Sequence, residues 1–341
     1  MRSPTIHAAV ANRLGDRARW RLWELAFWAA AAVSIVALPD RHLILTEIAI
    51  LALFALSLDL LLGFAGIISL GHAAFFGLGG YVAGLLARHE IIGEPLLALL
   101  VAGLAAALLG FVTSFLVLRG SDLTRLMVTL GVALILREIA NQIDWLTGGA
   151  DGLQGITMKP VLATFRFDMF GHTAYVYCLT VLFVLFLLAR RIVYSPFGLS
   201  LSSLKDNPLR AAAIGISVDR RQVAIYTIAA GYAGIAGGLL AQTTAFASLE
   251  LFSFDRSADL LLVLIVGGVG YLYGGLIGAV IFKFMHEWLS TLTPQYWQFW
   301  VGFVLVIIVL IGSERLSSWA GPIRALRDRI AGRLPRVLSG R

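Results

Sequence analysis

The sequence predicts an all-α integral membrane protein with about ten transmembrane helices and both termini in the cytoplasm. The first observation behind this prediction is the composition: 59% of the 341 residues are hydrophobic, and only 14% are charged. Soluble domains carry about 25% charged residues. The second observation is that the apolar residues form long runs, and the third is that Lys and Arg cluster in the segments between alternate runs.

Ten apolar runs are candidate membrane spans. The eighth is too short to cross a bilayer upright, and only residues 267–270 separate it from the ninth, so this pair is either a tight hairpin or a broken helix. The ten runs are Leu22–Leu38, Leu43–Leu62, Ile68–Leu86, Leu96–Leu118, Leu123–Ala140, Tyr175–Ala189, Gln222–Leu240, Ala258–Gly267, Tyr271–Leu289 and Tyr296–Ile311.

The basic residues orient these spans. With ten spans both termini lie on one side, and that side then carries twenty Lys and Arg residues, against six on the other. Because cytoplasmic segments hold the excess of positive charge, we expect a cytoplasmic tail (1–21), a transmembrane domain (22–311) with a long cytoplasmic loop (190–221), and a basic cytoplasmic tail (312–341).

The loop 190–221 contains the signature of a short helix. Asp206 and Asn207 are candidates for its N-cap, Pro208 suits its first position, and Gly215 suits its end. A helix between two membrane spans is placed to contact something outside the membrane. The alternative is a solvated connection with one amphipathic turn.

Several kinds of chemistry are absent from the sequence. The three lysines do not lie in a phosphate-binding loop, so the chain has no ATPase site of this type, and no residue spacing is typical of a metal site. Cys178 is the single cysteine, which excludes an intrachain disulfide. The arginines flank apolar runs and do not form one basic face, so no nucleic-acid partner is expected.

Polar residues within the apolar runs are the remaining signals. Asp59 lies in the second run, and Ser69 and His72 lie three apart in the third, where they would share one side of a helix. For His72 a hydrogen bond between helices and a contact with substrate both stay open. A serine hydrolase would also need an oxyanion hole and a third group that orients the base. Arg137 and Glu138 are explained by a position near a helix end.

Four segments, in order, resemble the permease subunits of branched-chain amino-acid ABC importers. The first is ALSLDLLLGFAGIISLGHAAFFGLGGY (55–81), and the second is TLGVALILREIA (129–140) with the loop LTGGADGL (146–153) after it. The third is SPFG (195–198), continued by KDNPLRAAAIG (205–215), and the last is LVLIVGGVGYLYGGLIGA (262–279). The family usually has Asn, Gln and Glu where Asp59, Ile67 and Ala212 stand.

The resemblance implies an ABC importer permease bundle that is itself no enzyme. Its partners would be a homologous second permease, two cytoplasmic ATP-binding subunits that hydrolyse ATP with Mg, and a periplasmic solute-binding protein, all at a bacterial inner membrane. Cofactors are then expected in the partners only. The resemblance assigns ATPase coupling to Asp206, Asn207, Pro208, Arg210, Ala211, Ala212 and Gly215.

The resemblance also implies two further groups of residues. Near the translocation path would lie Asp59, Ser69, Gly71, His72, Phe75 and Phe76. The loop that faces the binding protein would contain Gly148, Gly149, Asp151 and Gly152, although such a loop could also only cap the bundle. The family carries branched-chain amino acids, and relatives carry urea, amides or aromatic acids. A secondary transporter driven by an ion gradient is the alternative function.

Overall fold

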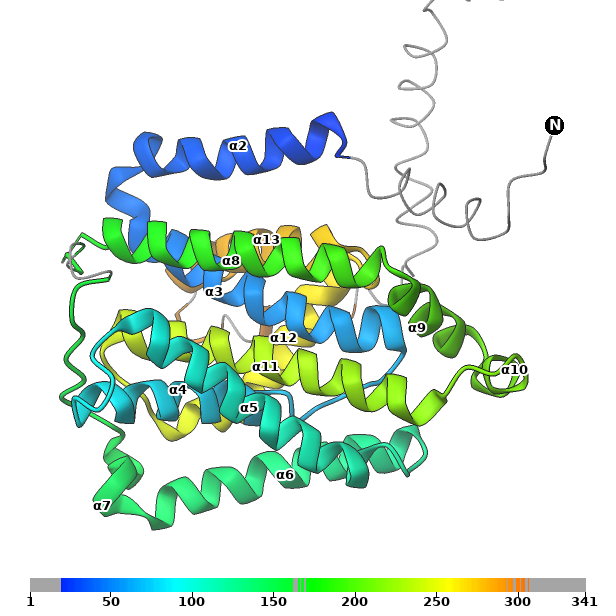
Figure 1. The fold of residues 1–341 in the computed structure, drawn as a ribbon. Coiled ribbons are helices and arrows are strands. Elements are labelled where there is room, and N and C mark those ends of the chain that lie inside the picture. The colour runs from blue at the N-terminus through cyan, green and yellow to red at the C-terminus, as the bar shows by residue number, and fades with distance from the viewer. Residues whose placement is uncertain are drawn as a thin grey trace, which may run out of the picture. The chain divides into compact units, whose positions relative to one another are not determined.

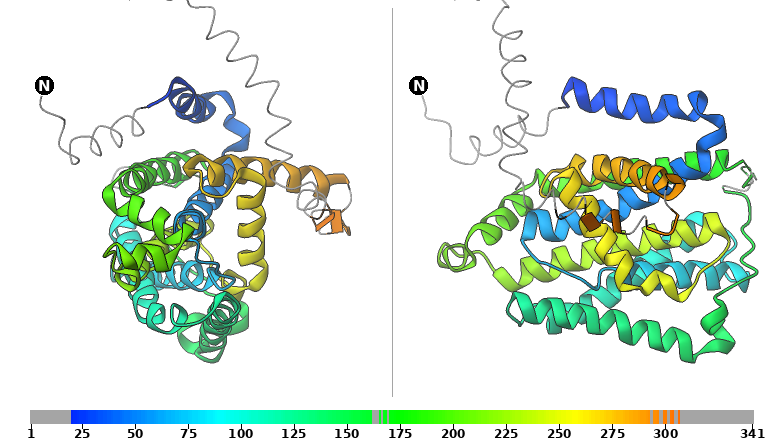
Figure 2. Two further views of the ribbon diagram at one scale, coloured as in Figure 1. Left: turned by 90° about the vertical axis from the view of Figure 1, so that its right-hand side faces the viewer. Right: turned by 180° about the vertical axis from the view of Figure 1, so that it is seen from behind.

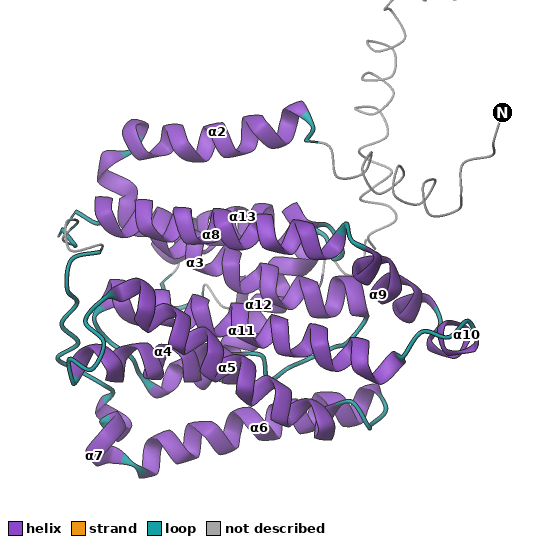
Figure 3. Ribbon diagram, viewed as in Figure 1, coloured by secondary structure: helices purple, strands orange, loops and turns teal. Residues whose placement is uncertain are grey.

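The computed structural model describes residues 20–161, 165, 167–168, 170–292, 294–296, 299–300, 302–303 and 306. The chain divides into two units, residues 1–283 and 284–341. In its described part the chain is helical apart from turns, loops and two isolated β-bridges (Figures 1 and 3). Most of the predicted tenth span and of both predicted tails lies outside the described residues.

The helices follow the apolar runs closely. In chain order they are α2 (Leu22–Ala37), η1 (Pro39–Arg41), α3 (His42–Leu58), η2 (Asp59–Phe64), α4 (Ala73–Arg88), α5 (Pro95–Val117), α6 (Asp122–Gln142), α7 (Asp144–Thr147), η3 (Gly149–Asp151), α8 (His172–Val193), α9 (Pro196–Asp206), α10 (Pro208–Ala213), α11 (Val218–Thr244), η4 (Leu249–Phe252), α12 (Phe254–Gly267) and α13 (Leu272–Leu292).

Within the described residues, four helical stretches are long and apolar enough to cross a membrane: Pro39–Phe64, α5, α8 and α11. The bent pair α12 and α13 makes a fifth if it counts as one span, while α2 and α4 are apolar but shorter. The protein is therefore an all-α, multi-pass membrane protein. The number ten stays a prediction.

The third predicted span is wrong in its first part. Residues 66–72 form no helix, and α4 begins only at Ala73 (Figure 3). Ser69 and His72 therefore do not share a helix face, as the three-residue spacing had predicted. We refer to residues 66–72 as the first break. The last turn of the preceding helix is the π-helical η2, a form often found at functional sites.

A second break separates α12 from α13. The chain turns through 110° at residues 268–271, so α12 and α13 are not antiparallel as in a tight hairpin, and the pair is either a broken span or a re-entrant loop. Gly268 and Gly270 have φ values of +99° and +84°, which favour glycine. Figure 2 shows α12 running across the direction of its neighbours.

Helix α11 lies at the centre of the first unit, against α3, α4 and α5 (Figures 1 and 2). Small residues make this packing close. A Cβ atom on Gly79 would run into the carbonyl of Gly234, and one on Gly237 would run into the carbonyl of Phe76. Such contacts between small residues let helix backbones approach in lipid.

The two ends of this unit differ in charge. The α5–α6 turn, α9, α10 and the start of α11 lie at one end, and α7 and the α4–α5 turn lie at the other (Figures 1 and 2). We call these the α10 end and the α7 end. The α10 end carries Arg119, Arg125, Arg190, Arg191, Lys205, Arg210, Arg220 and Arg221.

Candidate functional site

The first break is held open by hydroxyl groups from other helices. The backbone N–H of Leu70 donates to Thr129 Oγ1 on α6 (3.2 Å), and the N–H of Ala73 donates to Ser257 Oγ on α12 (3.0 Å). A helix interruption inside a membrane leaves backbone groups without helical partners, and each unsatisfied group there costs several kcal/mol. These two side chains therefore make the interruption stable.

Asp59 joins the first break to the second. The carboxyl is fully buried, and its Oδ1 accepts a hydrogen bond from the Gly270 N–H (2.7 Å). Beside it, Lys205 Nζ on α9 donates to the carbonyl oxygen of Gly63 (2.7 Å) and attracts the Asp59 carboxyl. Asp59 was expected near a translocation path; Lys205 was not singled out.

His72 makes a hydrogen bond between segments. Its Nε2 and Ser57 Oγ on α3 lie 2.8 Å apart, and its ring stacks on Phe54 at 5.7 Å between centroids. This is the structural role that the sequence left open for His72. A contact with substrate stays a prediction.

The other predicted path residues gather around the same break. Phe75 and Phe76 are buried on α4, against Tyr226 and Phe54 respectively. Gly71 lies so close to α6 that a Cβ atom would run into the carbonyl of Thr129. Among the residues that the structure describes, the buried Ser69 Oγ has no hydrogen-bond partner.

Helix α10 has the predicted signature. Asn207 is its N-cap, and the side-chain oxygen accepts a hydrogen bond from the Arg210 N–H (3.0 Å). The N–H groups of Gly215 and Ile216 bond back to Ala212 and Ala211, and Gly215 has a φ of +89°. Of the residues assigned to coupling only Ala211 is buried; Asp206, Pro208, Ala212 and the others are exposed.

Helix α9 precedes α10 directly and was not predicted. Ser195 caps it, Pro196 occupies its first position, and Leu201 and Leu204 are buried. It contacts α8, α11 and η2. Thus α9 is anchored in the bundle while α10 projects from it, as Figure 1 shows.

At the α7 end, the predicted loop 146–153 is folded against the bundle. Gly148, Gly149 and Gly152 all have positive φ values, and a β-bridge pairs Leu153 with Ala247. Gly149 and Gly152 are buried, whereas Asp151 is exposed. The glycines thus shape the turn, and Asp151 is the member that a partner can reach.

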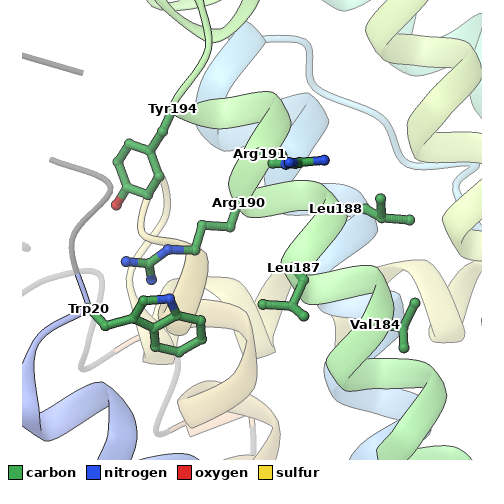
Figure 4. Close-up of a pocket in the computed structure, with 7 residues that line it drawn as sticks. All are labelled: Trp20, Val184, Leu187, Leu188, Arg190, Arg191 and Tyr194. Carbon is green, nitrogen blue, oxygen red and sulfur yellow. The ribbon is translucent and has the colours of Figure 1, made fainter. Parts of the chain in front are cut away.

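A cavity of about 510 Å³ lies near the start of α2 (Figure 4). The guanidinium of Arg190 on α8 stands between the rings of Trp20 and Tyr194, and it pairs with the buried carboxylate of Glu24 at 2.5 Å. The Tyr273 hydroxyl on α13 also donates to Glu24 (3.5 Å). This arrangement anchors α2 to α8 and α13.

Sequence reasoning missed the side chains that support the breaks, namely Ser57, Thr129, Lys205 and Ser257. Ser57 and Thr129 lie inside apolar runs, and that position was a usable signal, because an isolated polar group in a membrane span needs a partner. Ser257 lies just before an apolar run and Lys205 lies in the polar loop 190–221, so neither stood out from its neighbours. The sequence did not tell which partner.

The chain is similar in sequence to a family of permeases. The model of a family described as "Branched-chain amino acid transport system / permease component" matches residues 42–310. The high-affinity branched-chain amino acid transport system permease protein LivM of Escherichia coli K12 is 27% identical over 82% of this chain and 70% of its own.

Two further relatives are also permease proteins of branched-chain amino acid transport. LivM of Salmonella typhimurium is 28% identical over 84% of this chain and 72% of its own. The probable branched-chain amino acid transport permease protein LivH of Methanocaldococcus jannaschii is 28% identical over 68% of this chain and 74% of its own. No solved structure gives a significant match.

The family match covers both breaks, α9 and α10, and most of the helices described above. The chain therefore belongs to the family of permease components of branched-chain amino-acid ABC transport systems.

Proposed function

We propose that the chain is one of two transmembrane subunits of a bacterial, ATP-driven, binding-protein-dependent importer. Its cargo is branched-chain amino acids or related small solutes such as urea, amides or aromatic acids. It works with a second permease, two ATP-binding subunits that supply ATP and Mg chemistry, and a periplasmic solute-binding protein, in the inner membrane.

The observation that carries this proposal is the exposed surface of α10. Leu209 is 84% exposed and Ile214 70% exposed, on a capped helix that projects from the bundle beside Arg210. Apolar side chains held in water on an ordered helix are typical of a docking surface. A helix in the groove of a partner would cover them.

The charge of the two ends supports the orientation. The basic residues at the α10 end favour a cytoplasmic location for that end by the positive-inside rule, where an ATPase would be. The α7 end, with the exposed Asp151, then faces the periplasm and the binding protein.

We infer that the first break lies beside the translocation path, with Asp59, Ser69, Gly71, His72, Phe75 and Phe76 around it. Helices with unwound segments near the middle of the membrane are typical of transport sites. Phe75 and Phe76 are buried here beside Tyr226 and Phe54 respectively.

Docking is tested by replacing Leu209 with Asp in the assembly purified with its ATPase subunits. Leu209 is exposed, so the fold should survive, while a charge in the groove should lower ATPase co-purification by about tenfold or more. The matched control is Ile91→Asp, 70% exposed in the α4–α5 turn at the α7 end. Equal co-purification of the two variants would remove the docking role from α10.

The alternative function, a secondary transporter, also has broken helices. The two are separated by uptake in vesicles that are depleted of ATP but retain their ion gradient. An importer of the proposed type should stop taking up solute in these vesicles, because it depends on ATP. Continued uptake would show that the gradient drives transport.

A further inference from the structure

We propose that Lys205 is a positioning residue that passes the movement of α9 and α10 to both helix breaks. The path runs from the Lys205 ammonium to the Gly63 carbonyl, and through Asp59 to the Gly270 N–H. This inference rests on the proposed function, since it needs an ATPase that moves α10.

The first step of the path is short and charged. Lys205 Nζ lies 2.7 Å from the Gly63 oxygen in η2. Hydrogen bonds from an ammonium are about twice as strong as those between neutral groups. Because Lys205 lies only two residues before the cap of α10, a shift of α10 displaces this donor directly.

The segments along the path are in contact, so a displacement of one segment is passed to the next with little loss. A Cβ atom on Gly66, whose φ is +71°, would lie 3.1 Å from Lys205 Cγ. A Cβ atom on Gly63 would lie 2.7 Å from the nitrogen of Gly270. The stem of Lys205 therefore packs against the start of the first break, and η2 packs against the second break; such contacts transmit displacement.

The second step depends on Asp59. Its Oδ1 holds the Gly270 N–H, while its Oδ2 is buried and has no hydrogen-bond partner among the described residues. The attraction of Lys205 offsets part of the cost of burying this carboxyl. Without Lys205 the acid would lie buried with no cation beside it, a costly arrangement in a membrane.

Helix α9 is fixed against the bundle, so it can pass a movement of α10 to the rest of the protein. Leu201 and Leu204, on α9, are buried, and α9 contacts η2. The exposed α10 follows after Asn207 alone. A force on α10 therefore reaches η2 through an ordered helix that already rests on it.

The test uses hydrogen exchange on the assembly purified with its ATPase subunits, with and without trapping by ATP and vanadate. In the unaltered protein, trapping should change exchange at α10 and also at residues 59–73. In Lys205→Met the change at α10 should persist, while the change at 59–73 should shrink by about tenfold. A purely structural Lys205 would alter exchange equally with and without nucleotide.

Two further variants keep the result interpretable. Lys205→Met combined with Asp59→Asn removes both charges, so the chain should fold even if the single variant does not, and the response at 59–73 should still be lost. Lys159→Met, the matched control at the α7 end, should keep the full response.

The two failures are distinguishable. If trapping leaves α10 unchanged in the unaltered protein, no ATPase docks there and the proposed function is wrong. If α10 responds and the break responds equally in the double variant and in Lys159→Met, the path through Lys205 is wrong.

Discussion

At the scale of single residues, Gly237 shows how closely α11 and α4 approach. A methyl group there would run into the Phe76 carbonyl, so Gly237→Ala should lower the free energy of unfolding by about 1–3 kcal/mol. Gly131→Ala on α6 is the control, because its methyl would meet nothing within 4 Å. Thermal unfolding in detergent measures both, and equal midpoints would contradict close packing at Gly237.

The same scale shows which residues sequence reasoning placed well. The cap at Asn207 and the stop at Gly215 were predicted, because capping depends on a few neighbouring residues. Ser69 and His72 were placed on a helix that does not exist there. The groups that stabilise the break, Thr129 and Ser257, are distant in sequence, and a local pattern does not contain them.

At the scale of elements, α10 depends on its cap. Asn207→Ala removes the acceptor of the Arg210 N–H and should cost α10 about 0.5–2 kcal/mol. Amide exchange at 209–213 should then speed up by about 2- to 30-fold. Asn207→Asp keeps an acceptor and should exchange like the unaltered protein, whereas equal acceleration in both would show that the cap contributes nothing.

Element boundaries were predicted within a few residues where a helix is long and apolar, as for α5 and α8. Helix α9 was missed since its polar and apolar residues alternate within a charged loop, where burial of Leu201 and Leu204 decides. The break between α12 and α13 was foreseen as one of two alternatives. The run of glycines marked the turn but not its angle.

At the scale of the whole molecule, orientation can be measured with single cysteines. Leu209→Cys and Trp145→Cys place thiols at the α10 and α7 ends, on side chains 84% and 79% exposed. A membrane-impermeant maleimide on intact spheroplasts should label Trp145→Cys, and Leu209→Cys only after lysis. The buried Cys178 gives little background, and the reverse order of labelling would invert the proposed topology.

Fold class and family followed from the sequence because composition and ordered motifs act over the whole chain. The cargo did not follow, since the residues around the first break are buried against one another. They show how the bundle is held and not what passes through it.

The hydroxyl of Ser257 has a consequence for how the chain is made. It accepts the hydrogen bond of the Ala73 N–H, 184 residues earlier in the chain. In the same way, the Asp59 carboxylate accepts a hydrogen bond from the Gly270 N–H, which is synthesised much later. During synthesis α3 and α4 therefore leave the ribosome long before the groups that complete them. A nascent chain that ends before α12 has an unfinished first break, so release of α3 and α4 from the insertion machinery into lipid should be delayed until α12 and the second break have emerged.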